Sequence, residues 1–396
     1  MGNRENIKEK ELEVVKYLKW YQALQKKRTF CLLLIPLSIF LLWLVKQNSW
    51  ISENIFARGI YIPVSKVISF ITGIFPFSFM EIAIVILPIS LVIIIVLFLF
   101  KLIKRIVHKR NSLYFLTLSI VNIACLFSCL YFFYTVMCGV NYHRYPFAQI
   151  AGLQVEESSV QELYQLTLSL SEKAGELRET IAKEEGNIDE RGYIKVNQTG
   201  WKAVASTANR AYDKIGTSYP ELSGKYNLAK PVHFSEFMSR MEITGIFWPF
   251  TMEANVNVDV PQYSVPVTIC HELAHQRGYM REDEANFIAY LVCKQSDDLL
   301  FQYSGVMLAL TYAGNQLYKQ DPGLYNQIRA TYTVAVTTDL REEYYYWAKF
   351  EDTVISTVSN TMNDSYLKAN SQQDGVKSYG RMVDLLLADY KQANMK

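Results

Sequence analysis

Three long apolar runs set the first limit on how this chain can fold. They cover residues 30–45, 82–100 and 113–140. A helix needs about 20 consecutive apolar residues to cross a bilayer, and the second and third runs reach that length. The first run is shorter, but Trp43, Lys46 and Trp50 are residue types that favour the membrane interface and would complete it. The sequence therefore predicts three transmembrane helices.

Basic residues flank these runs in a pattern that predicts their orientation. Residues 26–28 precede the first run, and the loop between the second and third runs holds five more basic residues: Lys101, Lys104, Arg105, Lys109 and Arg110. Lys and Arg concentrate in the cytoplasmic loops of membrane proteins, so both clusters place the N-terminus in the cytoplasm. Three crossings then carry the rest of the chain to the outer side. No small-residue cleavage site follows the first run, and we expect a multi-pass protein that stays in the cell membrane.

The chain is expected to have three parts: a cytoplasmic amphipathic segment at 1–28, a membrane domain at 29–140 and an extracytoplasmic domain at 141–396. Two interpretations of residues 51–80 stay open, a partly apolar loop on the outer interface of the membrane and an ordinary folded loop. The 40 basic and 38 acidic residues leave a net charge of +2. The chain therefore lacks the excess of basic residues that would indicate nucleic-acid binding. The expected partners are the lipid bilayer and a peptide or protein substrate.

The outer part has the pattern of a mainly α-helical (α+β) domain with a small sheet. Helices are expected at 156–185, 201–215, 299–318, 342–360 and 381–390, and another begins at Val267. Residues 245–258 have the composition of a strand, and Pro249 places that strand at an edge of the sheet. An edge strand can hold an extended peptide by backbone pairing, which makes Glu253 and Asn255 candidates for substrate contact. A purely structural strand is the alternative.

The residues His271-Glu272-Leu273-Ala274-His275 carry the predicted chemistry. Positions four apart share one face of a helix, so both imidazoles can reach one ion. Glu272 lies about 100° around the helix and can take a proton from water at that ion. The motif predicts one catalytic zinc ion with His271 and His275 as ligands and Glu272 as the general base.

Catalytic zinc needs a third protein ligand, and the residues after the motif offer two. Gly278 can end the first helix in a left-handed conformation, and a second helix can begin near Glu282 and pack back against the first. Glu282 is preferred over Glu284 because it shares a helix face with Asn286, whose amide can hydrogen-bond a ligand histidine. The choice between the two glutamates stays open. Asp283 and Glu284 are otherwise expected to be solvated acids at a helix N-terminus.

Two further groups of side chains are expected near this site. Zinc peptidases need a hydrogen-bond donor for the oxyanion, and the candidates are Tyr366, Tyr379, Arg381 and His233. Cys270 and Cys293 fall in the polar part of the chain. They could form a disulfide if two helices lie side by side, but two buried free thiols are the preferred expectation.

These residues and motifs resemble those of two known families. The motif followed by Glu-x-x-Ala-Asn at 282–286 resembles the gluzincin class of zinc metallopeptidases, in which the downstream glutamate is the third zinc ligand. Three spans, the stretch 245–257, the motif extended to HELAHQRG and the stretch 363–386 are together similar to a bacterial membrane family described as domain of unknown function 3810. The resemblance implies a zincin-like domain on a bacterial cytoplasmic membrane. Two departures are the short separation between His275 and Glu282, and Asn286 where many gluzincins have Asp.

The predicted function is a membrane-anchored, zinc-dependent metallopeptidase that hydrolyses peptide bonds on the extracytoplasmic side. Zinc would polarise the scissile carbonyl while Glu272 moves the proton from water to the leaving amine. The alternative is a non-catalytic membrane-bound binding or sensory protein with a structural or vestigial zinc site, in which Glu272 has no purpose. The sequence indicates neither the substrate nor the oligomeric state.

Overall fold

The computed structural model describes residues 22, 24–184, 186–196, 200–370 and 380–394. The chain forms two compact units. Unit 1 consists of Met1–Asn48 and Ile82–Met137, and unit 2 consists of Ser49–Glu81 and Cys138–Lys396. The second junction lies close to the boundary expected at residue 140. Residues 49–81, however, were expected in the membrane domain and instead fold with unit 2.

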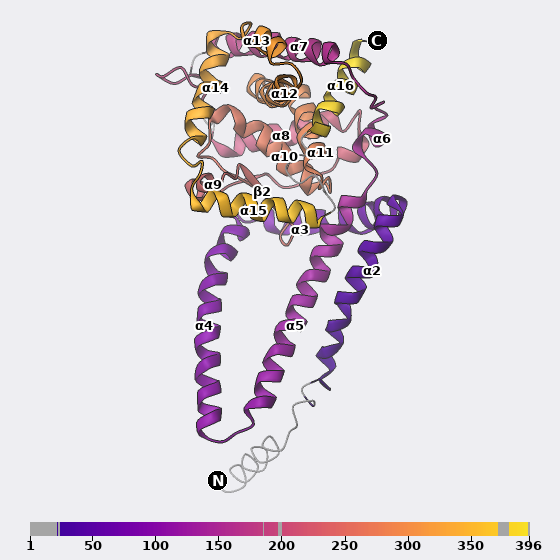
Figure 1. The fold of residues 1–396 in the computed structure, drawn as a ribbon, viewed down its shortest axis with the longest axis vertical. Coiled ribbons are helices and arrows are strands. Elements are labelled where there is room, and N and C mark those ends of the chain that lie inside the picture. The colour runs from indigo at the N-terminus through magenta and orange to yellow at the C-terminus, as the bar shows by residue number, and fades with distance from the viewer. Residues whose placement is uncertain (1–21, 23, 185, 197–199, 371–379, 395–396) are drawn as a thin grey trace. The chain divides into compact units, whose positions relative to one another are not determined.

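The long apolar helices include the three predicted spans (Figure 1). In unit 1 the helical segments are η2 (Lys27–Leu33), α2 (Leu34–Gln47), most of α4 (Phe79–Val107), and α5 (Ser112–Met137). Within the described residues, four helical stretches are long and apolar enough to cross a membrane: Lys27–Gln47, Ile51–Gly73, Phe79–Val107 and Ser112–His143. Helices of this length and apolar composition are typical of a membrane protein. The amphipathic helix expected ahead of the first span falls mostly outside the described residues.

The expected loop at 51–80 is helical over most of its length. It contains the π-helix η3 (Ile51–Tyr61) and the α-helix α3 (Ile62–Gly73). Glu53 is fully buried and its carboxylate accepts hydrogen bonds from Arg144, at 2.8 Å from Nε and 3.0 Å from Nη2. A buried charge is stable only when it is paired in this way, so the contact attaches η3 to the rest of unit 2.

Helices form most of unit 2. Its larger helices are α7 (Val160–Lys183), α8 (Trp201–Ile215), α10 (Val265–Gln276), α11 (Glu282–Gln295), α12 (Leu299–Gln320), α14 (Val334–Trp347), α15 (Val354–Ala369) and α16 (Gly380–Asn394). Shorter ones are η4 (Gly139–His143), α6 (Phe147–Ala151), η5 (Pro220–Leu222), α9 (Ser235–Arg240), η6 (Gln262–Ser264) and α13 (Pro322–Arg329). The apolar helix α12 lies centrally, with α7 and α13 on one side and α10 and α11 on the other (Figure 1). One hydrophobic core joins these helices, so the predicted mainly helical class is confirmed.

Local signals place most of these helices where they were expected. Ser159 and Glu162 form a reciprocal capping box at the start of α7, and α8 has the bounds that its apolar spacing predicts. The single helix expected at 342–360 is wrong, because the chain breaks between α14 and α15. Asp352 adopts a left-handed conformation there, with φ of 57°, and the Thr353 side chain caps the new helix.

The sheet has three short strands in the order β1-β3-β2. They are β1 (Lys230–Pro231), β2 (Gly245–Trp248) and β3 (Glu253–Val256). Strand β1 pairs parallel to β3, and β2 pairs antiparallel to β3. The expected single strand at 245–258 is therefore a hairpin, with Pro249 in the turn, where a missing N–H costs nothing. Strands β1 and β2 are therefore the edge strands, and β3 is central.

The central position of β3 contradicts the expected role of Glu253 and Asn255 in substrate contact. Both side chains are buried. The Glu253 carboxylate pairs with Lys230 Nζ at 2.5 Å and accepts the backbone N–H groups of Phe79 and Met80. Asn255 accepts a hydrogen bond from Ser78 Oγ at 2.6 Å. Both residues hold the start of α4 on the sheet instead of facing solvent.

Candidate metal centre

The helix that carries the HExxH motif ends as predicted. Gly278 has φ of 88°, in the left-handed region that glycine tolerates best. Its N–H donates to the His275 carbonyl at 2.8 Å, and the Tyr279 N–H donates to the Ala274 carbonyl at 3.2 Å. These two bonds form a Schellman motif. A Cβ at Gly278 would lie 2.9 Å from Arg144 Nη1, so the close packing at the turn also requires glycine.

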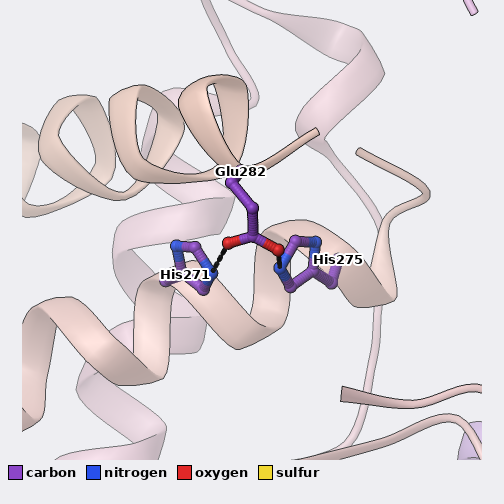
Figure 2. A group of neighbouring side chains, drawn as sticks. All are labelled: His271, His275 and Glu282. Carbon is purple, nitrogen blue, oxygen red and sulfur yellow. Dashed lines mark ion pairs between the residues drawn. The ribbon is translucent and has the colours of Figure 1, made fainter. Parts of the chain in front are cut away.

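Three predicted ligands converge beside this turn (Figure 2). Glu282 is the first residue of α11, and its carboxylate points between the two histidine rings of α10. Its Oε2 lies 3.3 Å from His271 Nε2, and its Oε1 lies 3.5 Å from His275 Nε2. Candidate ligand atoms of the three residues all lie within 4.8 Å of one another. Donors around a tetrahedral zinc, at about 2.0–2.2 Å from the ion, are separated by about 3.3 Å, so this donor set fits the metal.

The two other acids at the start of α11 have different contacts. Glu284 Oε1 accepts the Phe147 backbone N–H and Arg281 Nη2, each at 2.7 Å. Asp283 pairs with Arg381 Nε at 3.0 Å. Both side chains are buried, so the expectation of solvated acids is wrong, and the geometry brings Glu282 to the histidines instead of Glu284.

The histidines are oriented by neighbours on the same two helices. His275 Nδ1 lies 2.7 Å from the Tyr279 carbonyl, which requires a proton on Nδ1 and leaves the Nε2 lone pair for a metal. The Asn286 amide donates to Tyr312 Oη at 3.2 Å and acts to raise the pKa of His271, and its expected role in supporting a ligand histidine stays a prediction. Within the described residues, Nδ1 of His271 has no hydrogen-bond partner.

The pKa values of Glu282 and His275 favour the protonation states that metal binding needs. Burial alone would raise the pKa of Glu282, but His275 and His271 lower it to about 2. Burial lowers the pKa of His275 to about 4, so its imidazole is neutral near pH 7. Burial also acts to lower the pKa of His271, but Glu282 outweighs it and the net shift is upward. A metal therefore competes with a proton mainly at His271.

Glu272 lies beside the three ligands and against the edge strand. The backbone N–H of Phe247 acts to lower its pKa, and a Cβ added at Gly245 would lie only 2.4 Å from its Oε1. Its other oxygen, Oε2, is buried and has no hydrogen-bond partner among the described residues. Burial raises the pKa of this carboxyl to about 8, although His271 opposes the shift. A carboxyl with this pKa holds its proton near pH 7, and a cation bound by the neighbouring residues would lower the pKa again and let the group act as a base.

Comparisons with known proteins place the chain in a family. A family model described as "Protein of unknown function (DUF3810)" matches residues 56–387. The chain belongs to this family. The matched range includes α3, the sheet, both ligand-bearing helices and α15. Comparisons with curated proteins and with solved structures found no match.

In this DUF3810 chain the segment before α4 supports the motif helix. Tyr61 Oη donates to the carbonyl groups of His275 and Gln276, at 3.1 Å each. Gln276 Nε2 donates to Ser69 Oγ at 3.2 Å and to the Met252 carbonyl at 2.6 Å. Sequence reasoning missed these residues, because Tyr61 lies 214 positions from His275 and no local pattern connects them.

The remaining candidates of the DUF3810 chain have other contacts. Tyr366 Oη lies 3.2 Å from Tyr142 Oη, and Arg381 pairs with Asp283. The His233 ring packs edge-on against Phe234, and Tyr379 lies outside the described residues. None of these observations assigns an oxyanion donor.

The two cysteines of unit 2 near the motif are buried free thiols, as predicted. Cys270 precedes His271 on α10, and Cys293 lies on α11. Their Sγ atoms are 3.6 Å apart, in a weak hydrogen bond that joins the two ligand-bearing helices.

Proposed function

We propose that this DUF3810 protein is a zinc-dependent metallopeptidase that hydrolyses peptide bonds. The convergence of His271, His275 and Glu282 carries the proposal, because it offers two imidazole nitrogen donors and one carboxylate on a pair of packed helices. Three protein ligands leave a fourth position open, which is the arrangement of catalytic and not of structural zinc sites. The site therefore resembles those of gluzincins in its donor set.

Each catalytic group has a part in the proposed reaction. A bound zinc ion would supply a Lewis acid for the scissile carbonyl and lower the pKa of a water molecule. Glu272 accepts a proton from the attacking water at Oε2, the oxygen that has no hydrogen-bond partner among the described residues. It then returns the proton to the nitrogen of the leaving amine. His275 keeps its orientation through Tyr279 while this happens.

The edge strand β2 offers a place for the substrate backbone. Strand β3 occupies one edge of β2, and Gly245 of β2 lies against Glu272, because a Cβ there would come within 2.4 Å of Glu272 Oε1. The Phe247 ring centroid lies 6.4 Å from that of His275. An extended peptide beside β2 would lie next to the general base, which moves the proposed substrate contact from Glu253 and Asn255 to β2.

We also propose that α2, α4 and α5 cross the bacterial cytoplasmic membrane and that unit 2 lies on the extracytoplasmic side. The basic loop between α4 and α5 supports this orientation. The stretch Ile51–Gly73 is apolar enough to span, but the buried pair of Glu53 and Arg144 supports its place within unit 2. An odd number of crossings then separates the N-terminus from unit 2.

The test uses the full chain in detergent or nanodiscs, because a fragment that begins at residue 141 lacks Tyr61 and the rest of 49–81. Zinc content and cleavage of a peptide library are measured for the parent chain, Glu272→Gln and Glu282→Gln. Glu236→Gln, at an exposed residue of α9, is the matched control. We expect one zinc per chain and cleavage in the parent and the control. Glu272→Gln keeps zinc and loses about 10²–10⁴-fold in kcat, and Glu282→Gln loses zinc.

Two outcomes would overturn the proposal. A parent chain that binds no zinc under conditions that load other zinc proteins contradicts the metal centre. A chain that binds zinc but cleaves no peptide of the library, with Glu272→Gln unchanged in every property, favours the non-catalytic binding or sensory protein.

A further inference from the structure

Helix α3 has its polar residues inside and its apolar residues outside. The buried side chains of this helix are Ser65, Ser69 and Thr72. Its most exposed apolar side chains are Val67, Phe70 and, just beyond its end, Ile74, which are 60%, 70% and 68% exposed. A helix on the surface of a soluble domain has the opposite pattern, so water is not the expected environment of the outer face.

Helix α15 repeats this inversion. Two of its three buried residues are serines, Ser356 and Ser359. On the outside lie Val354, Val358 and Met362, which are 81%, 53% and 67% exposed. Figure 1 shows α3 and α15 at the same edge of unit 2, opposite the edge formed by α7 and α13.

Specific polar contacts hold the inner face of α3 toward unit 2. Thr72 Oγ1 donates to the Thr251 carbonyl at 3.0 Å, and its own carbonyl accepts from Lys230 Nζ at 2.9 Å. Ser69 Oγ accepts from Gln276 at 3.2 Å. These bonds fix the rotation of the helix, so its apolar side cannot turn inward.

The inner face of α15 is held in a similar way. Asn360 Nδ2 donates to Glu242 at 2.8 Å, and Tyr366 Oη contacts Tyr142 Oη at 3.2 Å. The apolar outer face is therefore a fixed feature of the fold.

Both helices adjoin points where the chain passes between the units. These junctions follow Asn48, Glu81 and Met137. Helix α3 ends six residues before Phe79, the first residue of α4. Cys138 Sγ, at the third junction, lies 3.6 Å from Tyr366 Oη of α15. Within unit 2, the residues next to the second and third junctions thus lie near the ends of the two helices that bear the apolar faces.

We propose that the outer faces of α3 and α15 together bind the surface of the lipid bilayer, so that unit 2 lies flat on the membrane. Exposed aliphatic and aromatic side chains on helices with a polar opposite side are typical of interfacial membrane contact. Apolar surface exposed in this way usually marks a binding face. The bilayer is the expected partner, because the chain leaves unit 2 after Glu81 and returns at Cys138, close to these two helices, and continues there into apolar helices long enough to cross a membrane. This inference does not depend on zinc or on peptidase activity.

Site-specific photocrosslinking tests the proposal without an activity measurement. Benzoylphenylalanine replaces Phe70 on α3 or Val358 on α15 in the full chain, which is reconstituted in vesicles of phosphatidylethanolamine and phosphatidylglycerol. The matched control is the same replacement at Tyr318, which is 55% exposed and packs edge-on against Tyr325 of α13. After illumination, the adducts are identified by mass spectrometry. All three positions are exposed, so thermal unfolding should match that of the parent chain.

We expect lipid adducts at Phe70 and Val358 at least tenfold above those at Tyr318. Equal lipid adducts at all three positions, or none at Phe70 and Val358, would overturn the proposal. Crosslinks from these two positions mainly to a second copy of the chain would also overturn it, because they would show that protein covers the surface.

Discussion

At the scale of single residues, Gly245 sets the space available to the proposed general base. A Cβ at this position would lie 2.4 Å from Oε1 of Glu272, a distance that real contacts do not reach. Gly245→Ala should therefore displace the carboxylate and lower kcat by about tenfold or more, as small displacements at catalytic groups do. Zinc content should not change, because His271, His275 and Glu282 do not contact Gly245 in this arrangement.

The matched control is Gly59→Ala, where an added Cβ would meet only the Asn54 carbonyl at an ordinary 3.4 Å. Peptide cleavage and metal analysis on both variants check the prediction. A Gly245→Ala variant with parental kcat would show that Glu272 is not constrained by β2.

Glu342 provides a pH test away from the metal centre. Burial raises its pKa to about 7, and Asp339 adds to the shift. The folded chain then holds a proton that the unfolded chain releases near pH 4.5, so the free energy of unfolding falls as the pH rises from about 4.5 to about 7. In Glu342→Gln this fall in the free energy of unfolding should be absent, because the glutamine side chain does not titrate. The variant should melt at the same temperature as the parent at pH 4.5 and at a higher one at pH 8.

Thermal unfolding at several pH values measures this difference, with Glu351→Gln, at an exposed residue, as the control for the change in charge. A difference in Tm that stays constant from pH 4.5 to pH 8 would contradict the assignment to Glu342.

The residues that the sequence predicted at the site are those linked by local spacing. His271, Glu272 and His275 share one helix, and Glu282 follows after a turn that Gly278 makes recognisable. Asp283 was expected in solvent because acids at a helix start usually lie there, but Arg381, 98 positions away, buries it. Such distant partners leave no pattern in a single sequence.

At the scale of helices and strands, apolar periodicity predicts an element well when its apolar side faces the core. Helices α7, α8 and α12 follow this rule and were expected within a few residues of their bounds. The segment 51–73 does not, because the buried side of α3 is polar and that of η3 mixes polar with apolar residues, and the segment was therefore interpreted as a loop. The hairpin of β2 and β3 was interpreted as one strand, since its turn contains too few residues to interrupt the composition.

The attachment of η3 to unit 2 depends on one buried ion pair. Arg144 and Glu53 are both almost fully buried, and Arg144 also lies over the ring of Tyr279, 4.4 Å from its centroid. Arg144→Met leaves the Glu53 carboxylate buried with only the more exposed Arg58 as an ionic partner. Breaking a buried pair in this way typically costs about 3–5 kcal/mol of unfolding free energy.

The control breaks the exposed pair of Arg240 and Glu236 on α9 with Arg240→Met, which should cost about 0.3–0.5 kcal/mol. Denaturant unfolding of both variants in the same detergent gives the comparison. Equal losses in the two variants would mean that the buried pair does not attach the segment.

At the scale of the whole molecule, the composition predicted a membrane part followed by an outer domain, and the structure adds Ser49–Glu81 to that domain. The addition could not be predicted, because it depends on contacts such as the one between Tyr61 and His275 that join distant parts of the chain. It also decides where the candidate site lies. Ser69 of α3 contacts Gln276, the residue after His275, while Phe70 of α3 is exposed on the outer face.

The candidate site is therefore about one helix diameter, or about 10–12 Å, from the proposed lipid-binding face.

If both proposals hold, peptide bonds close to a membrane anchor should be the preferred substrates, because an extended segment of about six residues spans about 20 Å and reaches the site. A peptide attached to lipid through a spacer of about six residues should be cleaved at least tenfold faster than the same peptide on a spacer of about thirty. The parent chain is reconstituted in vesicles that carry one peptide or the other at equal surface density, and the initial rate of cleavage is measured. Both peptides are equally enriched on the vesicle, so a difference in rate reports the height of the site above the bilayer, whereas equal rates would contradict a site that lies close to the membrane surface.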